Sequence, residues 1–121
     1  MEIRPLLRDQ MVHENGADGK RLVPWPELNA PFEGAWVVVR PGGATGAHSH
    51  HEYEIFIAMT GEAELESAGE RNAFRAGDIV HFPPHTDHRV INESATDFQF
   101  YCVWWDTEMS ARFSDRHEGK A

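Results

Sequence analysis

Short apolar stretches separated by Gly and Pro occupy the middle of the chain. The clearest alternation lies at 62–67, where Ala63 and Leu65 alternate with three glutamates. A period of two is typical of a half-buried strand, and the Ala68-Gly69 pair that follows predicts a hairpin turn. Short strands at close spacing favour an all-β sandwich or barrel. The stretches that predict strands are 35–40, 53–59, 62–67, 71–74, 79–82, 88–92 and 97–106.

The two ends of the chain lack this pattern. The first 33 residues are polar and are interrupted by Gly and Pro, so they predict an arm with one short strand near Arg21–Val23. The C-terminal end predicts a helical turn around Glu108–Phe113 and disorder from Ser114 onward. The predicted organisation is therefore an N-terminal arm (1–33), a single β-barrel domain (34–107) and a C-terminal tail (108–121).

Two of the predicted strands carry side chains that could line a pocket, but the sequence does not tell which face of each strand points inward. Arg40 is notable because a cation on a barrel strand is costly unless it meets a carboxylate. We expect its partner to be either a substrate carboxylate or an internal glutamate such as Glu52. The sets that share a face are Trp36, Val38 and Arg40; Gln99, Tyr101, Val103 and Trp105; and Phe98, Phe100, Cys102 and Trp104.

Composition and charge narrow the function. A length of 121 residues fits one domain. A net charge of −9 repels phosphate polymers and anionic membranes, so nucleic acid and membrane partners are not expected. Cys102 is the only cysteine, which excludes an internal disulfide and a cysteine-based zinc site. There is no apolar stretch of about 18 residues and no signal-peptide pattern, so we expect a cytoplasmic protein.

Three metal donors lie close together in the segment HSHHEYE. In an extended chain, alternate residues share a face, so His48, His50 and Glu54 project to one side. Imidazole and carboxylate are donors that zinc, manganese, iron, cobalt, nickel and copper accept. Exposed histidines of a polar turn are the alternative. We favour a metal site because a carboxylate that is buried among imidazoles needs a cation.

Two segments resemble the paired motifs of the cupin family. The first has Gly42, five residues, His-x-His, three residues, Glu54, six residues and Gly61. The second, at 77–92, has Gly, five residues, Pro-x-His, two residues, His, three residues and Asn. The spacing agrees throughout, and one residue departs: His85 stands where the family usually has Gly.

The resemblance implies an all-β, single-domain cupin β-barrel, also called a double-stranded β-helix or jelly roll. It implies that His88 is the fourth ligand beside His48, His50 and Glu54, with coordination positions open to water or substrate at the barrel mouth.

Three residues are candidates for a catalytic role: Glu54, Arg40 and His85. For His85, either the turn is reshaped around a residue other than glycine, or its ring faces the substrate.

The face of strand 53–59 opposite the metal donors is expected to be covered by another surface. Ile55, Ile57 and Met59 lie opposite the ligand face of their strand and would be wet in an isolated barrel. Cupins commonly pair through such a surface, so we expect a homodimer or a docking surface.

A narrower resemblance links the chain to small cupins encoded beside, or fused to, methionyl-tRNA synthetase-like enzymes of hydrazine biosynthesis in secondary metabolism. The segments that carry it are WPELNAPFEGAWVVV, GAHSHHEYEIFIAMTGEAELES, FPPHTDHRVIN and DFQFYCVWWD. It implies a zinc cupin that rearranges an O-aminoacyl-hydroxylamine ester into an N–N bond, with the ester supplied by the synthetase-like partner.

Other functions share the ligand set. An iron-dependent dioxygenase, a metal-dependent isomerase or epimerase, and a small-molecule-binding cupin without catalysis remain open. The donors alone do not select one metal, and iron, manganese or nickel are also possible; the narrower resemblance implies one divalent ion, with zinc favoured.

Overall fold

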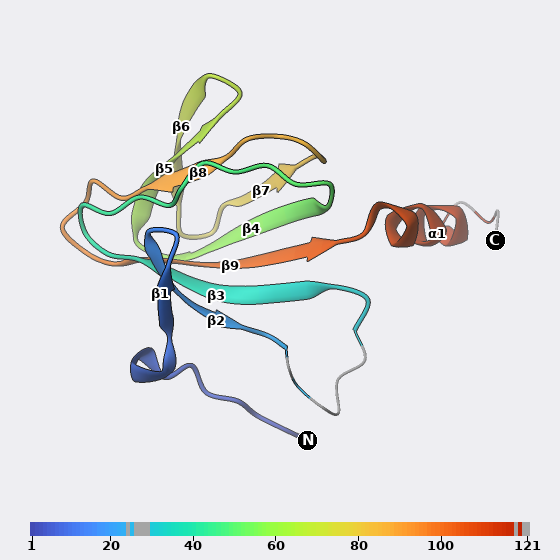
Figure 1. The fold of residues 1–121 in the computed structure, drawn as a ribbon, viewed down its shortest axis with the longest axis horizontal. Helices are drawn as coiled ribbons and strands as arrows, with labels where there is room; N and C mark the ends of the chain where they lie inside the picture. The colour runs from blue at the N-terminus through green and yellow to red at the C-terminus, as the bar shows by residue number, and fades with distance from the viewer. Residues whose placement is uncertain (24, 26–29, 118, 120–121) are drawn as a thin grey trace.

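The protein folds into two antiparallel β-sheets that face each other. The computed structural model describes residues 1–23, 25, 30–117 and 119. The larger sheet has the strand order β1-β2-β3-β9-β4-β7, and the smaller has β6-β5-β8 (Figure 1). This arrangement confirms the predicted all-β class. The elements are η1 (Arg8–Gln10), β1 (Val12–Glu14), β2 (Ala17–Arg21), β3 (Glu33–Val39), β4 (Tyr53–Thr60), β5 (Glu62–Ser67), β6 (Glu70–Arg75), β7 (Ile79–Phe82), β8 (Arg89–Ile91), β9 (Phe98–Trp105) and α1 (Thr107–His117).

The seven strands predicted between residues 35 and 106 are all present, with ends that differ by at most two residues. The expectation for the first 33 residues was less accurate. The strand placed near 21–23 ends at Arg21 instead, and a second strand precedes it. Asn15 and Gly16 have φ of 51° and 81° and connect Glu14 to its partner Ala17. Two positive φ values at a two-residue Asn-Gly loop form the tight hairpin turn that joins β1 to β2.

The core lies between the two sheets, and its composition settles which strand faces point inward. Phe98, Phe100 and Cys102 of β9 are buried and pack with Phe56 of β4 and Val39 of β3. The intervening residues of β9, including Tyr101, are only partly buried. Trp36 meets Tyr101 edge to face on the outside of the larger sheet, with ring centroids 5.4 Å apart.

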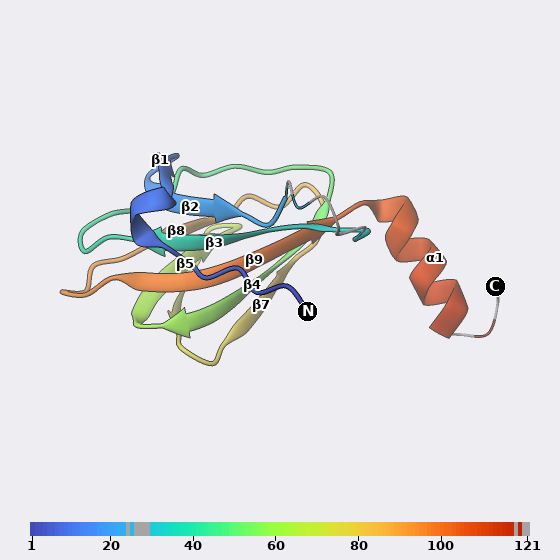
Figure 2. The ribbon, with the colours of Figure 1, turned by 90° about the horizontal axis from the view of Figure 1, so that it is seen from below.

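Helix α1 projects away from the sheets, as both views show (Figures 1 and 2). Asp106 begins it, because its Oδ1 accepts hydrogen bonds from the amides of Glu108 at 2.7 Å and Met109 at 3.3 Å. The predicted helical turn is confirmed and extends further, so the expectation of disorder from residue 114 is wrong as far as His117. Residues 118, 120 and 121 lie outside the described part. None of the described helices has the length and apolar character that a membrane crossing needs.

Candidate metal centre

Two segments that are far apart in the sequence meet at one end of the fold. His48 and His88 form an isolated antiparallel bridge, in which each backbone amide donates to the other's carbonyl, at 3.4 and 3.2 Å. His50 lies in the loop before β4, and Glu54 lies on the inner face of β4. The expected extended strand over 48–54 is therefore wrong: the segment has a single bridge at His48, a bend at residues 51–52 and a strand that begins only at Tyr53.

The four predicted ligands converge. One donor atom from each of His48, His50, Glu54 and His88 lies within 4.8 Å of the other three. Glu54 Oε1 is 3.0 Å from His50 Nε2 and 2.9 Å from His88 Nε2. Glu54 and His88 are buried, His50 is half-buried and His48 is exposed. The cluster is therefore closed on the core side and open toward solvent.

Backbone carbonyls fix the orientation of all three imidazoles. The Nδ1 atoms of His48, His50 and His88 lie 3.2, 3.2 and 2.9 Å from the carbonyl oxygens of Gly46, Glu52 and Thr86. A carbonyl oxygen only accepts, so each Nδ1 carries the proton. In this tautomer the Nε2 atoms of His50 and His88 carry lone pairs, and they face Glu54 Oε1 at 3.0 and 2.9 Å.

This arrangement fits a divalent metal ion. The buried Nε2 of His88 has no hydrogen-bond partner among the described residues, since its approach to Glu54 lacks hydrogen-bond geometry. Nitrogen lone pairs aimed at a buried carboxylate repel each other unless a cation lies between them. Histidines that donate through their other nitrogen to a carbonyl are also typical of metal ligands. Three nitrogens and one carboxylate oxygen form a donor set that first-row metals accept.

Aromatic rings make the floor of the cluster apolar. The ring of Phe82 stacks on His88, with centroids 4.3 Å apart and planes 14° apart. Phe56 meets His88 edge to face at 5.4 Å. These rings pack against the core side of the cluster, while the exposed side is that of His48.

A pocket of about 830 Å³ lies over the cluster. Its walls come from the N-terminal segment and β1, from all of β2, and from the inner faces of β3, β9 and β4. They include His48, His50 and Glu54 beside Arg21 and Trp104. The pocket thus joins the candidate metal position to a wall that carries both a cation and an aromatic ring.

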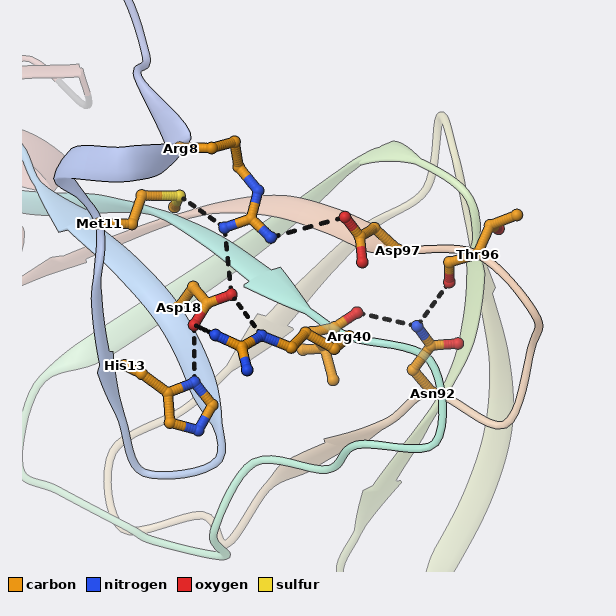
Figure 3. Close-up of polar contacts among 9 residues, drawn as sticks. Arg8, Met11, His13, Asp18, Arg40, Asn92, Thr96 and Asp97 are labelled. Carbon is orange, nitrogen blue, oxygen red and sulfur yellow. Dashed lines mark hydrogen bonds and ion pairs between the residues drawn. The ribbon is translucent and has the colours of Figure 1, made fainter.

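Arg40 does not itself line this pocket, although the carboxylate that it contacts, Asp18, does. It follows β3 on the outer face, and its guanidinium contacts both carboxylate oxygens of Asp18 at 2.9 Å (Figure 3). It is not among the described residues that line the pocket. Its partner is therefore an internal carboxylate, but Glu52 was the wrong choice, since Glu52 contacts His50 and His51 instead. Asp18 pairs with Val38, two residues before Arg40, and this register brings the Asp18 carboxylate next to Arg40.

Asp18 is a buried carboxylate with several cationic neighbours. Besides Arg40, it contacts Arg8 at 3.1 Å and His13 Nδ1 at 2.6 Å (Figure 3). Burial raises its pKa, but the hydrogen bonds from Arg40, His13 and Arg8 outweigh that effect and lower the pKa from 3.8 to about 2. This cluster ties the N-terminal hairpin to the end of β3.

His85 is not brought into the pocket. It has a positive φ of 62°, so the turn keeps the left-handed conformation that glycine usually supplies in the family. Its amide donates to the carbonyl of His50 at 2.7 Å, while the residue is exposed and does not line the pocket in the described part. Through its backbone, the turn that carries His85 supports a ligand loop.

Cys102 lines the pocket with a buried thiol. Burial raises the pKa of its thiol to about 12, with a further rise from the nearby Glu54 carboxylate. The thiol is therefore protonated, and it donates weakly to the carbonyl of Ala35 at 3.6 Å.

Two pocket residues were not identified as candidates from the sequence. The sequence pattern leaves the inward face of β9, and with it the direction of Trp104, open, and Arg21 falls in the predicted N-terminal arm. The Asn15-Gly16 pair was the missed signal, because a hairpin there predicts β2 and places Arg21 on the same face as Ala17.

Comparison with known proteins agrees with this architecture. A protein of Salinispora arenicola, described as a Cupin 2 conserved barrel domain protein, is 56% identical, with a TM-score of 0.85 over 97% of this chain and 98% of that chain. A protein of Photorhabdus luminescens is 44% identical, with a TM-score of 0.84 over 96% and 97% of the two chains. An oxalate-binding protein of Thermotoga maritima is 31% identical over 64 residues, which are 52% of this chain and about half (53%) of that protein's length.

The sequence model of the cupin domain matches residues 35–104. This range contains all four members of the candidate metal cluster and more than half of the 121 residues. The chain therefore belongs to the cupin domain family.

Proposed function

We propose that this cupin is a metal-dependent enzyme that acts on a small molecule held in its pocket. The observation that carries the proposal is the convergence of three imidazoles and one carboxylate at the base of an open pocket of about 830 Å³. A closed structural site would surround the ion with protein ligands, whereas here the side of His48 remains accessible.

Each residue of the cluster has a part that follows from its contacts. His48, His50, Glu54 and His88 would hold the ion, and three backbone carbonyls keep the imidazoles in the tautomer that binds it. A bound divalent ion supplies Lewis acidity at a coordination position that the protein leaves open. The pocket walls orient the ligand and exclude water from one side.

The specific reaction that we propose is formation of an N–N bond. An amine of an O-aminoacyl-hydroxylamine ester attacks the hydroxylamine nitrogen, the N–O bond breaks, and the carboxylate leaves with the bonding electrons. The proton of the attacking amine passes to solvent, so no external oxidant or reductant is needed. Glu14 and Glu52 on the pocket wall suit a cationic amine, and an enclosed chain brings the two nitrogens together.

The partners follow from the same proposal. The ester would come from a methionyl-tRNA synthetase-like protein or domain, because this reaction needs an activated carboxyl group. A second copy of the chain would cover the outer face of the larger sheet. Zinc is the proposed ion, because the reaction requires a Lewis acid without redox activity.

The test uses zinc-loaded protein and a freshly prepared aminoacyl ester of N6-hydroxylysine. We expect the parent chain to yield the hydrazine, detected by mass spectrometry, without consuming oxygen. His88→Ala should give none, and His51→Ala should behave like the parent, because the side chain of His51 is 67% exposed and lies outside the cluster. Equal yields from parent and His88→Ala contradict the proposal. Oxygen consumption by iron-loaded protein with thiol or catechol substrates would instead favour the dioxygenase alternative.

A further inference from the structure

Arg21 occupies a position that faces the metal cluster across the pocket. It is the last residue of β2 and pairs with Ala35 of β3, which in turn pairs with Cys102 of β9. Cross-strand partners project to the same face of a sheet. Ala35 and Cys102 are both core residues that line the pocket, so Arg21 also belongs to the inner face, and it lines the pocket with them.

The guanidinium of Arg21 has an aromatic contact and no anionic partner in the described structure. Its Cζ lies 5.5 Å from the centroid of the Trp104 ring. Arg8, Arg40 and Arg71 differ from it, since each contacts a carboxylate. An arginine stacked on an aromatic ring keeps its planar set of donors free for a bidentate anion.

The space between Arg21 and the cluster is open. Ala17 and Gly19 are the other inner-face residues of β2, and both line the pocket. Gly19 pairs with Val37, and a Cβ added to it would meet only the Trp36 carbonyl oxygen, at 3.7 Å. Small residues along this wall therefore leave room for a ligand that extends from Arg21 toward the histidines.

The sheet sets the approximate length of such a ligand. A row of paired residues runs from Arg21 through Ala35 and Cys102 to Phe56, two residues from Glu54. Three interstrand spacings separate the two ends of this row along the curved sheet, which is roughly 14 Å. The side chains of Arg21 and of the cluster shorten this gap, so a ligand of several bonds is needed to span it.

We propose that Arg21 binds the carboxylate of an elongated substrate whose other end reaches the His48, His50, Glu54 and His88 cluster. This inference rests on the proposed function for the role of the cluster. It names the substrate class: a flexible acid with a carboxylate at one end and a metal-binding polar group at the other. The α-carboxylate of an N-hydroxylated lysine or ornithine has this form.

The experiment measures binding of dicarboxylates, from malonate to pimelate, to the zinc-loaded full chain by calorimetry. We expect at least one member of the series to bind saturably to the parent. Arg21→Gln should weaken its binding by about ten- to a hundred-fold, and Arg21→Lys should restore part of the affinity. Arg112→Gln is the matched control, because it removes the same charge from the exposed surface of α1 and should change nothing.

A second variant locates the probe. Gly19→Leu fills the pocket wall and should abolish binding, while the zinc content stays at one ion per chain by elemental analysis. The inference is overturned if no dicarboxylate binds saturably, or if Arg21→Gln or Gly19→Leu binds as tightly as the parent. A parent chain that holds no zinc would overturn the proposed function instead, and the dependence of probe affinity on Arg21 would still decide the present inference.

Discussion

At the scale of single residues, backbone partners fix the orientation of the histidines of the cluster. Each Nδ1 lies against a carbonyl oxygen, and the Nε2 atoms of His50 and His88 lie 3.0 and 2.9 Å from Glu54 Oε1. Little side-chain entropy remains to be lost when a metal binds, which favours tight and selective coordination.

Removal of one ligand should therefore lower metal affinity strongly. We expect His88→Ala to weaken zinc binding by more than the roughly 10- to 100-fold typical of losing a supporting contact, as measured by competition with a chelating dye. His51→Ala is the control, since it removes an adjacent imidazole outside the cluster. Equal zinc affinity in both variants would show that the imidazole of His88 is not a ligand.

Asp18 should govern stability in acid. Its pKa is about 2 in the folded protein and about 3.8 when unfolded, so the folded state binds the proton less tightly. The stability it contributes is fully present above about pH 4 and is lost as the pH falls through 2. We expect urea unfolding to show this decline between pH 4 and 2 in the parent, and a flatter profile in Asp18→Asn.

The same variant should lower the free energy of unfolding at neutral pH by about 1.5–3 kcal/mol, because it weakens charged hydrogen bonds at a buried site. Asp97→Asn is the matched control. Asp97 is 39% exposed and contacts only Arg8 among described residues, at 3.6 Å, so its loss should cost under about 1 kcal/mol. An unchanged free energy of unfolding in Asp18→Asn would show that the cluster contributes little to stability.

At the scale of elements, the turn between β7 and β8 carries backbone strain at a residue that is not glycine. His85 adopts φ of 62°, which costs a residue with a Cβ about 1–2 kcal/mol. Part of this cost is offset because glycine loses more backbone entropy on folding. We expect His85→Gly to raise the free energy of unfolding by up to about 1 kcal/mol and to leave zinc affinity unchanged.

The outcome also decides the role of the His85 ring. Thermal unfolding and zinc titration of His85→Gly test whether His85 acts only through the backbone of its turn. His81→Gly, in a neighbouring strand, is the control. A loss of ester turnover at unchanged metal content would restore the ring as a catalytic group, against its exposed position.

The strands and the convergence of the candidate metal cluster could be predicted from the sequence because both depend on short-range patterns. Strand alternation and the two spaced motifs identified β3 to β9 and the four members of the cluster. The inward face of β9 could not be predicted, since Phe100 and Tyr101 are both aromatic and only the pairing of Trp104 with Glu54 distinguishes the faces.

The partner of Arg40 was missed for a related reason. It depends on the register between β2 and β3, which places Asp18 beside Val38. Register is set by long-range packing and by the hairpin at Asn15-Gly16. The same missed hairpin concealed Arg21 on the pocket wall.

At the scale of the whole molecule, the outer face of the larger sheet carries a surface that a single copy leaves uncovered. Tyr53 stacks between His81 and Trp105, with centroids 5.8 and 5.9 Å away. Ile57 beside them is half-buried, and its partner Ile79 is 67% exposed. A contiguous apolar surface of this kind is typical of an interface.

We expect a homodimer, with twice the 13.7 kDa mass of one chain in light scattering. Ile57→Glu should convert it to a monomer without unfolding it, because the added charge lies on the outer face. Ala73→Glu places the same charge on the exposed side of β6 and should leave the dimer intact. A monomeric parent at high micromolar concentration would contradict this expectation.

The most direct test of the central claim is anomalous diffraction from a crystal of the zinc-loaded protein, recorded at the zinc edge. We expect one peak per chain, within bonding distance of the Nε2 atoms of His48, His50 and His88 and of a Glu54 carboxylate oxygen. A fully zinc-loaded crystal with no peak there, or with its peak bound by other residues, would contradict the metal centre and the function built on it.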